Sequence, residues 1–374
     1  MTTPASRPTI ALLPGEGIGP SIVAQAHKVL EALRPFGFAC NCIEGAVGGV
    51  AYEAHGHPLP QATLALVRQA DAVLFGTVGD PRFDHLERAL RPERALLGLR
   101  REMGLYANLK QVSVPAELAA TSPLRAERVA GLDLLVVREL NGDVYTGQPR
   151  GRRSAPDGDF AGQREGFDTM RYAEGEVRRV ARIAFEAARA RRGRLCSVDK
   201  ANVLETSALW RAVVSETAAE FREVELTHLY ADNALMQLIA EPTRFDVIVT
   251  GNLFGDLLSD AASMLTGSIA MAASAMLGDG PRGMFEAGHG TALDIAGLDR
   301  ANPIACIRAA ALMLRHSLAR DDLALRIEAA VAAVLARGLR TAEMTGGAGT
   351  RCVGTEAMGD AVAAALAAPA GQGG

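Results

Sequence analysis

The chain has 374 residues, of which 49% are hydrophobic and 22% are charged, a composition that excludes disorder as the main state and a length that suits two domains. Its 39 Lys and Arg against 43 Asp and Glu give a formal net charge of -4, which excludes a strong global attraction to nucleic acid or to an anionic membrane. No apolar run reaches the roughly 18 residues that span a bilayer, and the first residues lack the layout of a secretory signal, so we expect a cytoplasmic protein.

Short apolar runs rich in Val, Ile and Leu alternate along the chain with longer segments of helical periodicity. This alternation is typical of parallel strands joined by crossover helices, so the predicted fold class is α/β. The expected strands lie at 9–13, 72–75, 132–137, 195–198 and 245–250. Residues that can do chemistry follow four of them: the glycine-rich segment 15–19, Arg138, Lys200, and Asn252 with Asp256 and Asp260. Because ligands bind beyond the carboxyl ends of strands in open α/β sheets, this placement predicts one shared cleft.

Four other segments have a clear local pattern. The stretch 151–166 is typical of a long polar loop or arm. The stretch 174–192 has apolar residues on one face and ends in arginines before Gly193, which predicts an amphipathic helix rather than a nucleic-acid patch. The alanine-rich stretch 305–336 predicts two packed helices, and 367–374 predicts a frayed tail.

The five cysteines are an odd number scattered along the chain, which favours reduced thiols over a disulfide framework. Cys40 and Cys42 are the only close pair. No further Cys or His follows them at ligand spacing, so a structural zinc site is not expected.

Asp256 and Asp260 follow an apolar strand and are four residues apart, so on a helix both side chains project from one face. Two carboxylates aimed the same way repel each other unless a cation lies between them, and oxygen ligands suit a hard ion such as Mg²⁺ or Mn²⁺. The alternative is that Asp256 only complements the positive end of a helix. Asp232 is either a third ligand or, as its position alone favours, the N-cap of the apolar helix that follows.

Lys200 and Tyr145 are the candidate proton carriers. Lys200 follows a strand rather than lying on a solvated helix face, and a nearby metal ion would favour its neutral, basic form. The alternative is a surface ammonium group paired with Asp199. Tyr145 either donates a proton or packs in a hairpin. Arg100, Lys110 and Arg138 lie in three segments that could converge on substrate carboxylates, although each alone is more often a surface residue.

Two glycine-containing segments are candidates for binding a dinucleotide. Segment 15–19 follows a strand but lacks the spacing of the Rossmann fingerprint and has no ribose-binding acid at the expected distance, so we discount it. Segment 286–297 offers backbone amides, the ring of His289 and the carboxylate of Asp294 for a ribose diol. The alternative is an ordinary polar loop with a packed histidine.

Taken together, these segments resemble the β-decarboxylating dehydrogenase family, whose members act on 3-isopropylmalate, isocitrate, homoisocitrate or tartrate. The resemblance covers nearly the whole chain. It rests on the segments 13–20 (LPGEGIGP), 91–100 (RPERALLGLR), 137–140 (VREL), 198–204 (VDKANVL), 250–260 (TGNLFGDLLSD) and 289–292 (HGTA). Several long motifs in the same order are far more specific than any one glycine loop.

The resemblance implies an isopropylmalate/isocitrate dehydrogenase-like α/β fold with a large central mixed sheet and a dinucleotide site that is not of the Rossmann type. It implies a discontinuous cofactor-binding domain, residues 1–105 and 267–374. It also implies a substrate-binding and dimerisation domain, residues 106–266, with a polar arm near 141–168. The family forms homodimers with shared active sites, to which Lys200 and Asp232 would come from the second subunit.

The activity that the resemblance implies is the NAD-dependent oxidative decarboxylation of 3-isopropylmalate to 2-oxo-4-methylpentanoate, in leucine biosynthesis. The implied cofactors are NAD and Mg²⁺ or Mn²⁺. One alternative is the same chemistry on another 3-substituted malate, of tartrate, homoisocitrate or alkylmalate type. The other is an inactive relative that only binds or dimerises. Neither nucleic acid nor membrane is an implied partner.

The resemblance also assigns roles to individual residues. Lys200 is the base and Tyr145 the acid. The implied metal ligands are Asp232, Asp256 and Asp260. The implied substrate-binding residues are Glu93, Leu96, Leu97, Arg100, Lys110, Arg138 and Val203. The implied cofactor-binding residues are Glu286, His289, Gly290, Thr291, Ala292, Asp294, Ile295 and Asn302.

The sequence departs from the family pattern at several positions. Lys110 stands where an arginine is usual, which removes a bidentate carboxylate clamp. Asp143 lies in a stretch around Tyr145 that is less polar in the family. Asp80 replaces a glycine, and Leu293 replaces a proline in the cofactor loop. These departures are the reason for keeping another 3-substituted malate as the alternative substrate.

Overall fold

The computed structural model of the protein describes residues 7–344 and 349–367. The chain forms two compact units. The first unit comprises Met1–Leu105, Leu109–Leu132 and Ser263–Gly374, and the second comprises Tyr106–Asn108 and Asp133–Ala262. The predicted partition placed residues 109–132 and 263–266 in the substrate-binding domain, whereas the contacts of these residues group them with the first unit. The functions assigned to the two domains stay predictions.

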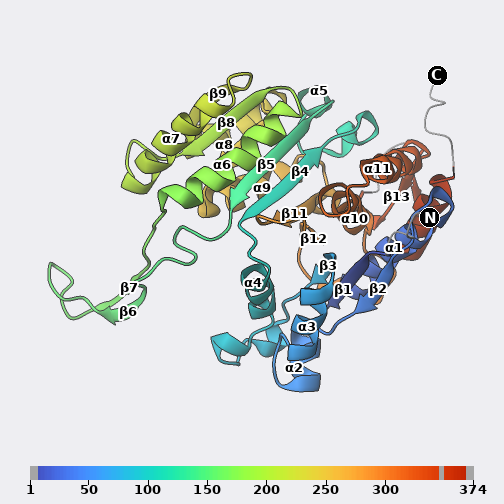
Figure 1. The fold of residues 1–374 in the computed structure, drawn as a ribbon, viewed down its shortest axis with the longest axis horizontal. Coiled ribbons are helices and arrows are strands. Elements are labelled where there is room, and N and C mark those ends of the chain that lie inside the picture. Colours follow the sequence, from blue (N-terminus) through green and yellow to red (C-terminus); the bar gives the residue numbers. More distant parts are fainter. Residues whose placement is uncertain (1–6, 345–348, 368–374) are drawn as a thin grey trace, which may run out of the picture. The chain divides into compact units, whose positions relative to one another are not determined.

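Ten strands of the described residues form one mixed sheet, in the order β2-β1-β3-β12-β11-β4-β5-β10-β8-β9 (Figure 1). They are β1 (Thr9–Gly15), β2 (Asn41–Glu44), β3 (Ala72–Thr77), β4 (Ala107–Ser113), β5 (Asp133–Glu139), β8 (Arg194–Asp199), β9 (Glu225–Tyr230), β10 (Val247–Thr250), β11 (Ala273–Leu277) and β12 (Met284–Ala287). In the first unit β1 runs parallel to β2 and β3, β12 runs parallel to β3, and β11 is antiparallel to β12. In the second unit β5, β10, β8 and β9 are parallel. The predicted α/β fold with a large mixed sheet is confirmed.

Helices connect these strands. In the first unit they are α1 (Gly19–Glu31), α2 (Gly49–His55), α3 (Gln61–Gln69), α4 (Glu93–Glu102), α5 (Ala126–Val129), α10 (Ile304–His316), α11 (Asp321–Ala336) and α12 (Thr355–Ala365). In the second unit they are α6 (Glu174–Arg189), α7 (Glu205–Thr217), α8 (Ala231–Ala240) and α9 (Asn252–Met264), whose last two residues cluster with the first unit. Among the residues that the structure describes, no helix is both long and apolar enough to cross a bilayer.

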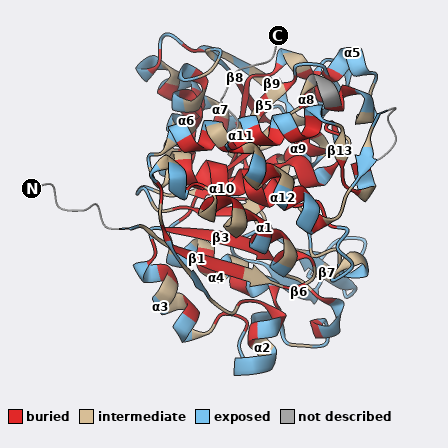
Figure 2. Ribbon diagram, turned by 90° about the vertical axis from the view of Figure 1, so that its right-hand side faces the viewer, coloured by how far each residue is buried: buried red, intermediate tan, exposed pale blue. Residues whose placement is uncertain are grey.

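Helix α10 forms the core of the first unit. Residues 304–314 are all buried, and the helix packs against α1, α11 and β12. Figure 2 shows it in the colour of buried residues along most of its length. The two packed helices predicted for 305–336 are therefore confirmed as α10 and α11. Residues 368–374 of the predicted tail lie outside the described residues. The five cysteines are free, and the Sγ atoms of Cys40 and Cys42 are 3.6 Å apart.

Helix α6 covers the parallel strands of the second unit. Its predicted apolar face is buried against β5, β8 and β10, beside α7. The ring of Phe185 on this helix stacks on Phe221, with centroids 5.1 Å apart. The helix ends before Gly193, whose φ of 72° is in the left-handed region and whose N–H donates to Ala188 O at 2.9 Å.

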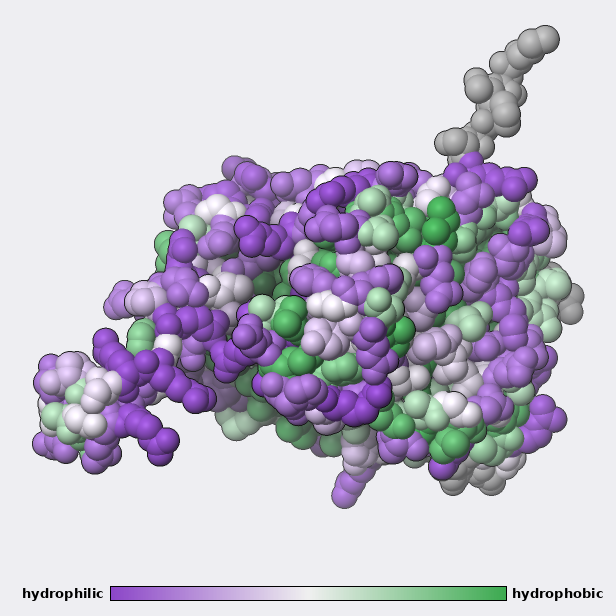
Figure 3. Space-filling model, turned by 90° about the horizontal axis from the view of Figure 1, so that it is seen from below, coloured by the Kyte–Doolittle hydropathy of each residue, from purple (hydrophilic) through white to green (hydrophobic). Residues whose placement is uncertain are grey.

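The polar stretch 151–166 forms an arm with regular structure. Strand β6 (Gly151–Ser154) pairs antiparallel with β7 (Arg164–Phe167), and most of the arm's residues are exposed. Figure 3 shows hydrophilic side chains along it. The expectation of a polar arm is met, but cross-strand hydrogen bonds replace the expected loop. A second short pair, β13 (Leu339–Arg340) and β14 (Arg351–Cys352), lies in the first unit.

All five predicted strands are present. The last of them begins at Val247 rather than at residue 245, because Pro242–Arg244 forms a 3-10 turn. Strands β2, β4, β9, β11 and β12 of the sheet were not predicted. Polar residues interrupt the apolar pattern of β2, β4 and β9, and the short strands β11 and β12 each contain a polar residue, Ser274 and Glu286.

Replacing Phe285, which is fully buried in β12, with alanine should lower the free energy of unfolding by about 3–5 kcal/mol, because the change leaves a cavity in a packed core. Phe160, which is 68% exposed in the arm, provides the matched control. Its replacement by alanine should change the free energy of unfolding by less than about 0.5 kcal/mol. Urea unfolding followed by circular dichroism measures both, and equal losses in the two variants would contradict the buried position of Phe285.

Candidate active site

Three predicted site residues come together in the second unit, where β5 ends and α9 begins. The parallel register of β5 and β10 pairs Arg138 with Thr250, so Arg138 lies beside the start of α9. Its guanidinium donates one hydrogen bond to Asn252 Oδ1 at 2.9 Å and another to Asp256 Oδ1. Tyr145 Oη donates to Asp256 Oδ2 at 2.6 Å. Asp256 is therefore held by a cation on one oxygen and by a phenol on the other.

Tyr145 lies in the loop after β5 and is 44% exposed, so it does not pack in a hairpin. Partial burial raises the pKa of Tyr145, and the hydrogen bond to Asp256 raises it further. The charge of Arg138, whose Cζ lies 5.5 Å from the centroid of the tyrosine ring, acts in the opposite direction. The hydroxyl is therefore protonated at neutral pH and can serve as a proton donor.

Lys200 and Asp232 form an ion pair where β8 and β9 end. The parallel register pairs Asp199 with Tyr230, which places the residues after the two strands side by side. Lys200 Nζ lies 2.8 Å from Asp232 Oδ1, and this hydrogen bond lowers the pKa of the Asp232 carboxyl group. Both side chains are accessible to a ligand, since that of Lys200 is 26% exposed and that of Asp232 is 64% exposed.

Two of the alternatives considered for these residues are wrong. Asp199 does not pair with Lys200, because its buried carboxylate accepts two hydrogen bonds from Arg211, each at 2.9 Å. The N-cap of α8 is Tyr230, so Asp232 lies inside the first turn of the helix. The first difference comes from α7, which carries Arg211, and the second from β9, which leads the chain from the sheet directly into α8.

Asp256 and Asp260 lie one turn apart on α9, and Asp260 is exposed. Their carboxylate oxygens are the donors that Mg²⁺ and Mn²⁺ prefer, so these residues fit such an ion. Asp232 does not join them in one chain: among residues 7–344 and 349–367, no group of three His, Cys, Asp or Glu side chains is placed to hold a metal ion. One chain therefore offers part of the predicted ligand set.

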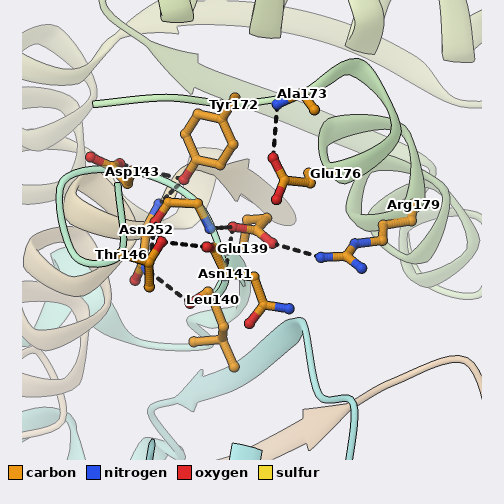
Figure 4. Close-up of polar contacts among 11 residues, drawn as sticks. Glu139, Leu140, Asn141, Asp143, Thr146, Tyr172, Ala173, Glu176, Arg179 and Asn252 are labelled. Carbon is orange, nitrogen blue, oxygen red and sulfur yellow. Dashed lines mark hydrogen bonds and ion pairs between the residues drawn. The ribbon is translucent and has the colours of Figure 1, made fainter. Parts of the chain in front are cut away.

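The loop that carries Tyr145 rests on a buried carboxylate, Glu139, to which the motif 137–140 assigned no role. Glu139 is fully buried, and its Oε2 accepts hydrogen bonds from the N–H groups of Asn141 at 2.8 Å and Gly142 at 2.7 Å (Figure 4). Its Oε1 lies 3.3 Å from Arg179 Nη2. Burial raises the pKa of Glu139 to about 7, against the opposite effect of the two amides and Arg179. A glutamate at the end of an apolar strand was the only signal of this role.

In the first unit, one face of α4 carries four predicted substrate-binding residues. They are Glu93, Leu96, Leu97 and Arg100, spaced i, i+3, i+4 and i+7. Leu97 is 46% exposed, and Arg100 Nε lies 3.2 Å from Met276 Sδ. An apolar surface and a cation are thus presented together on this helix.

The other two predicted substrate-binding residues differ in exposure. Lys110 lies in β4 and is 7% exposed, so it is not a solvated surface residue. Val203, which follows β8 in the second unit, is 68% exposed. The roles of both residues stay predictions.

Most of the predicted cofactor residues lie in β12 and in the loop that follows it. Ile18 N–H donates to Thr291 O at 2.9 Å, so the glycine-rich segment 15–19 supports this loop. Gly17 has φ 59°, and a Cβ there would lie 2.0 Å from Thr291 O, so only glycine allows the approach. Asp294 is exposed in the 3-10 helix Leu293–Ile295. The segment that lacks the Rossmann spacing thus contacts the predicted cofactor loop itself.

Two predicted cofactor residues have polar side chains that are largely enclosed. Burial lowers the pKa of His289, whose Nδ1 lies 3.1 Å from Gly290 O, so the imidazole is neutral at pH 7. Asn302 is buried, and its Oδ1 accepts a hydrogen bond from Ile304 N–H at 3.0 Å, at the start of α10. Their contacts with a cofactor stay predictions.

Glu16 is a second buried carboxylate, in the segment 13–20, to which the sequence analysis assigned no role. It accepts hydrogen bonds from Gly49 N–H and, at 2.6 Å, from Gly79 N–H. Burial raises the pKa of Glu16 to about 7. The nearby Asp80 pairs with Arg82 at 2.7 Å and caps the short helix that contains it, which gives a physical reason for an aspartate in place of glycine.

Comparison with known proteins places this arrangement among enzymes. The family model described as isocitrate/isopropylmalate dehydrogenase matches residues 9–362. A curated protein of Burkholderia pseudomallei named 3-isopropylmalate dehydrogenase is 59% identical over 357 residues, which are 96% of this chain and 99% of the relative. A protein of the same name from Bordetella avium is 59% identical over 358 residues, with the same coverage of 96% and 99%.

Solved structures share the fold. The isocitrate dehydrogenase of Methylococcus capsulatus matches with a TM-score of 0.82 at 34% identity, over 96% of this chain and 99% of that chain. A beta-decarboxylating dehydrogenase of Thermococcus kodakarensis, solved in its apo form, matches with a TM-score of 0.75 at 31% identity, over 96% of each chain.

Glu139→Gln should remove part of the pH dependence of stability. Because the pKa of Glu139 rises from 4.5 to about 7 on folding, the folded chain binds more protons than the unfolded chain in this interval. Stability therefore falls as the pH rises from about 4.5 to about 7, and this part of the decline should be absent in the variant. Melting temperatures measured across the interval test this, with Glu165→Gln in the exposed arm as control. Parallel curves for wild type and Glu139→Gln would contradict the assignment.

Proposed function

The chain belongs to the isocitrate/isopropylmalate dehydrogenase family, and from this premise we propose that it converts 3-isopropylmalate to 2-oxo-4-methylpentanoate in leucine biosynthesis, with NAD⁺ as the oxidant. The observation that carries the proposal is the cluster of Arg138, Tyr145 and Asp256 between β5 and α9. A carboxylate-binding cation, a protonated phenol and a metal-ligating carboxylate are groups that the oxidation and decarboxylation of a 2-hydroxy diacid require.

The reaction has three parts. C2 loses a hydride to NAD⁺ while its hydroxyl group loses a proton, which forms a ketone. The bond between C3 and its carboxyl group then breaks, and CO₂ leaves with the electron pair remaining on the organic product. Finally C3 gains a proton. The chain therefore needs a base near the hydroxyl oxygen on C2 and an acid near C3. It also needs positively charged groups that bind the two carboxylates.

Lys200 and Tyr145 are the proposed proton carriers. Lys200 Nζ takes the proton of the C2 hydroxyl group as the hydride leaves. Tyr145 Oη delivers a proton to C3 after CO₂ has left. Its raised pKa supports this role, because the phenol keeps its proton at neutral pH until negative charge develops on the substrate.

The substrate carboxylates are proposed to be held by Arg100, Lys110 and Arg138. The apolar surface of Leu96 and Leu97 on α4 would contact the isopropyl group. A substrate with a third carboxylate in place of the isopropyl group would have to lose the hydration of that charge against two leucines, which is strongly unfavourable. This favours 3-isopropylmalate over isocitrate.

Asp256 and Asp260, with Asp232 of the partner subunit, are proposed to hold Mg²⁺ or Mn²⁺, and the loop after β12 is proposed to hold NAD. When bound, the ion supplies Lewis acidity at the substrate oxygens and the nicotinamide supplies the hydride acceptor. The exposed Asp294 supports NAD over NADP, because a carboxylate accepts hydrogen bonds from ribose hydroxyl groups and repels a 2′-phosphate.

We also propose that the active enzyme is a homodimer. Helix α8 exposes Leu235, Met236 and Ile239, which are 37%, 61% and 53% exposed, and such apolar groups on one helix favour an interface. Within the described part of one chain Asp232 does not join the other two predicted ligands, so the ligand set would be completed across a two-fold interface. Lys200 would cross with Asp232, since the two form an ion pair.

Substrate profiling tests the proposed function. With NAD⁺ and Mg²⁺, kcat/KM for 3-isopropylmalate should exceed the values for isocitrate, tartrate and other alkylated malates by at least about tenfold, since one methylene in a fitted pocket is worth about that much. NADH absorbance measures the rates. A higher kcat/KM for one of the other compounds would show that this compound, and not 3-isopropylmalate, is the substrate. No NADH from any of them, with or without a divalent ion, would contradict dehydrogenase activity altogether.

Lys110→Arg tests the substituted clamp. If the lysine is only a weaker carboxylate ligand, the variant should lower KM for 3-isopropylmalate by several-fold, roughly the gain of one bidentate contact. A raised KM would show that the pocket is built around the shorter head group of lysine.

Lys200→Met should lower kcat at least about 100-fold, because the base is lost, while Mn²⁺ binding measured by electron paramagnetic resonance is retained. Lys28→Met is the matched control, since Lys28 forms an exposed ion pair with Asp360 at 2.6 Å. The sequence has only three lysines, Lys28, Lys110 and Lys200. In an NMR spectrum of the ¹³C-methylated protein, the lysine signal that is missing in each variant is therefore that of the replaced lysine. Unchanged turnover in Lys200→Met would remove Lys200 from the mechanism.

A further inference from the structure

The loop that carries Tyr145 contains a buried carboxylate that the proposed chemistry does not use. Asp143 is 1% exposed and has φ 75°, in the left-handed region that favours glycine. Its Oδ1 accepts a hydrogen bond from Val144 N–H at 2.7 Å, and its carbonyl oxygen accepts one from Gly147 N–H at 3.0 Å. An aspartate at this φ is strained relative to glycine, so the contacts of its side chain must offset the strain.

The same carboxylate reaches the start of α9. Asp143 Oδ2 accepts a hydrogen bond from Leu253 N–H at 3.1 Å, and Tyr172 Oη donates to it at 3.4 Å. Tyr172 Oη in turn accepts from Asn252 N–H at 2.7 Å (Figure 4). The first N–H groups of a helix have no partner within the helix, and negative charge beside them is favourable. Asp143 and Tyr172 therefore cap the helix that carries Asp256.

The side chain of Asn252 completes the network. Its Nδ2 donates to the carbonyl oxygens of Leu140 at 2.9 Å and Gly142 at 3.3 Å, while its Oδ1 accepts from Arg138. Tyr172 also excludes any side chain at Gly142, where a Cβ would lie 2.1 Å from Tyr172 Cε1. Hydrogen bonds thus run from the loop to the helix and from the helix back to the loop.

Tyr172 is itself fixed from two sides. Its ring packs edge-on against Trp210, with centroids 5.3 Å apart. The next residue, Ala173, is the N-cap of α6, and its N–H donates to Glu176 at 2.8 Å. Burial raises the pKa of Tyr172, and the charges of Glu139 and Asp143 raise it further, so the hydroxyl keeps the proton that it donates to Asp143.

We propose that Asp143 is a positioning residue, which holds Tyr145 at Asp256 by joining the tyrosine loop to the N-terminus of α9. The hydrogen bond between Tyr145 and Asp256 is present in the chain alone, so the positioning role does not depend on the identity of the substrate. Only the consequence for catalysis, delivery of the proton to C3, rests on the proposed function. Without this carboxylate the start of α9 loses a cap, and the loop loses the hydrogen bond between Asp143 Oδ2 and Leu253 N–H, one of its ties to the helix.

Asp143→Gly is the decisive variant, because glycine relieves the strain at φ 75° and removes the carboxylate. A loss of function in this variant cannot come from a strained backbone. Asp299→Gly is the matched control. Asp299 also has a positive φ, 53°, and its Oδ1 also accepts from a helix N-terminus, at Glu356 N–H of α12 at 2.9 Å.

Two activity measurements separate protonation from oxidation. One is kcat with 3-isopropylmalate, and the other is the exchange of the C3 protons of 2-oxo-4-methylpentanoate with D₂O in the presence of Mg²⁺ and NADH. Asp143→Gly should lower both about 100-fold, the scale of a misplaced general acid, with KM nearly unchanged. Asp143→Asn keeps an acceptor oxygen and tolerates this φ, so it should recover part of the loss. Asp299→Gly should match wild type.

A measurement without substrate tests position directly. The sequence has five tyrosines, so incorporation of 3-fluorotyrosine gives a simple ¹⁹F spectrum in which Tyr145→Phe assigns the signal of Tyr145. In wild type Tyr145 Oη donates to Asp256 Oδ2 at 2.6 Å, so the ¹⁹F chemical shift of Tyr145 differs from that of the unfolded chain. In Asp143→Gly the shift should move toward the value of the unfolded chain, because the tyrosine no longer stays at Asp256.

The outcomes are distinct. A ¹⁹F chemical shift of Tyr145 and an exchange rate equal to wild type in Asp143→Gly overturn the proposal. If that variant does not fold, Tyr172→Phe decides: it removes the hydroxyl that caps Asn252 N–H, and an unchanged exchange rate would overturn the proposal there. If wild type oxidises no 3-isopropylmalate, the proposed function fails, while the ¹⁹F comparison still decides whether Asp143 positions Tyr145.

Discussion

The site in the second unit depends on how the negative charge of α9 is compensated. Asp256 and Asp260 lie one turn apart on this helix, and their repulsion must be balanced by nearby cations. The parallel register of β5 and β10 places Arg138 nearby, and its guanidinium is the cation that binds Asp256. Tyr145 donates to the second oxygen of the same carboxylate, so the proposed acid is held by one of the proposed metal ligands. A substitution of Asp256 is therefore expected to displace Tyr145 and to weaken metal binding.

Buried carboxylates give this arrangement its rigidity. Glu139 binds the N–H groups at the beginning of the Tyr145 loop, and Asp143 binds those at its centre and at the start of α9. Burying a carboxylate costs free energy, which these hydrogen bonds and Arg179 partly offset. In return, these hydrogen bonds hold the Tyr145 loop in one conformation. Lys200 and Asp232 neutralise each other instead on the surface, where under the proposed function a divalent ion replaces the ammonium charge as the partner of Asp232.

The parts of the structure that depend on local pattern were predictable from the sequence. Apolar runs located five strands of the sheet, and the i, i+4 spacing placed Asp256 and Asp260 on one helix face. The partner of Lys200 was not predictable, because it depends on β9, an edge strand whose mixed residues resemble a loop. The roles of buried polar groups were missed for a similar reason: Tyr172 meets Asn252 80 residues further along the chain, and no spacing encodes that contact.

Under the proposed function, aspartates of two subunits hold one divalent ion beside the substrate. Anomalous diffraction from crystals grown with Mn²⁺ and 3-isopropylmalate tests it most directly. We expect one Mn²⁺ peak about 2 Å from carboxylate oxygens of Asp256 and Asp260 of one subunit and of Asp232 of the partner subunit. A peak bound by other residues, or three aspartates that remain apart with no ion between them while substrate is bound, would contradict it.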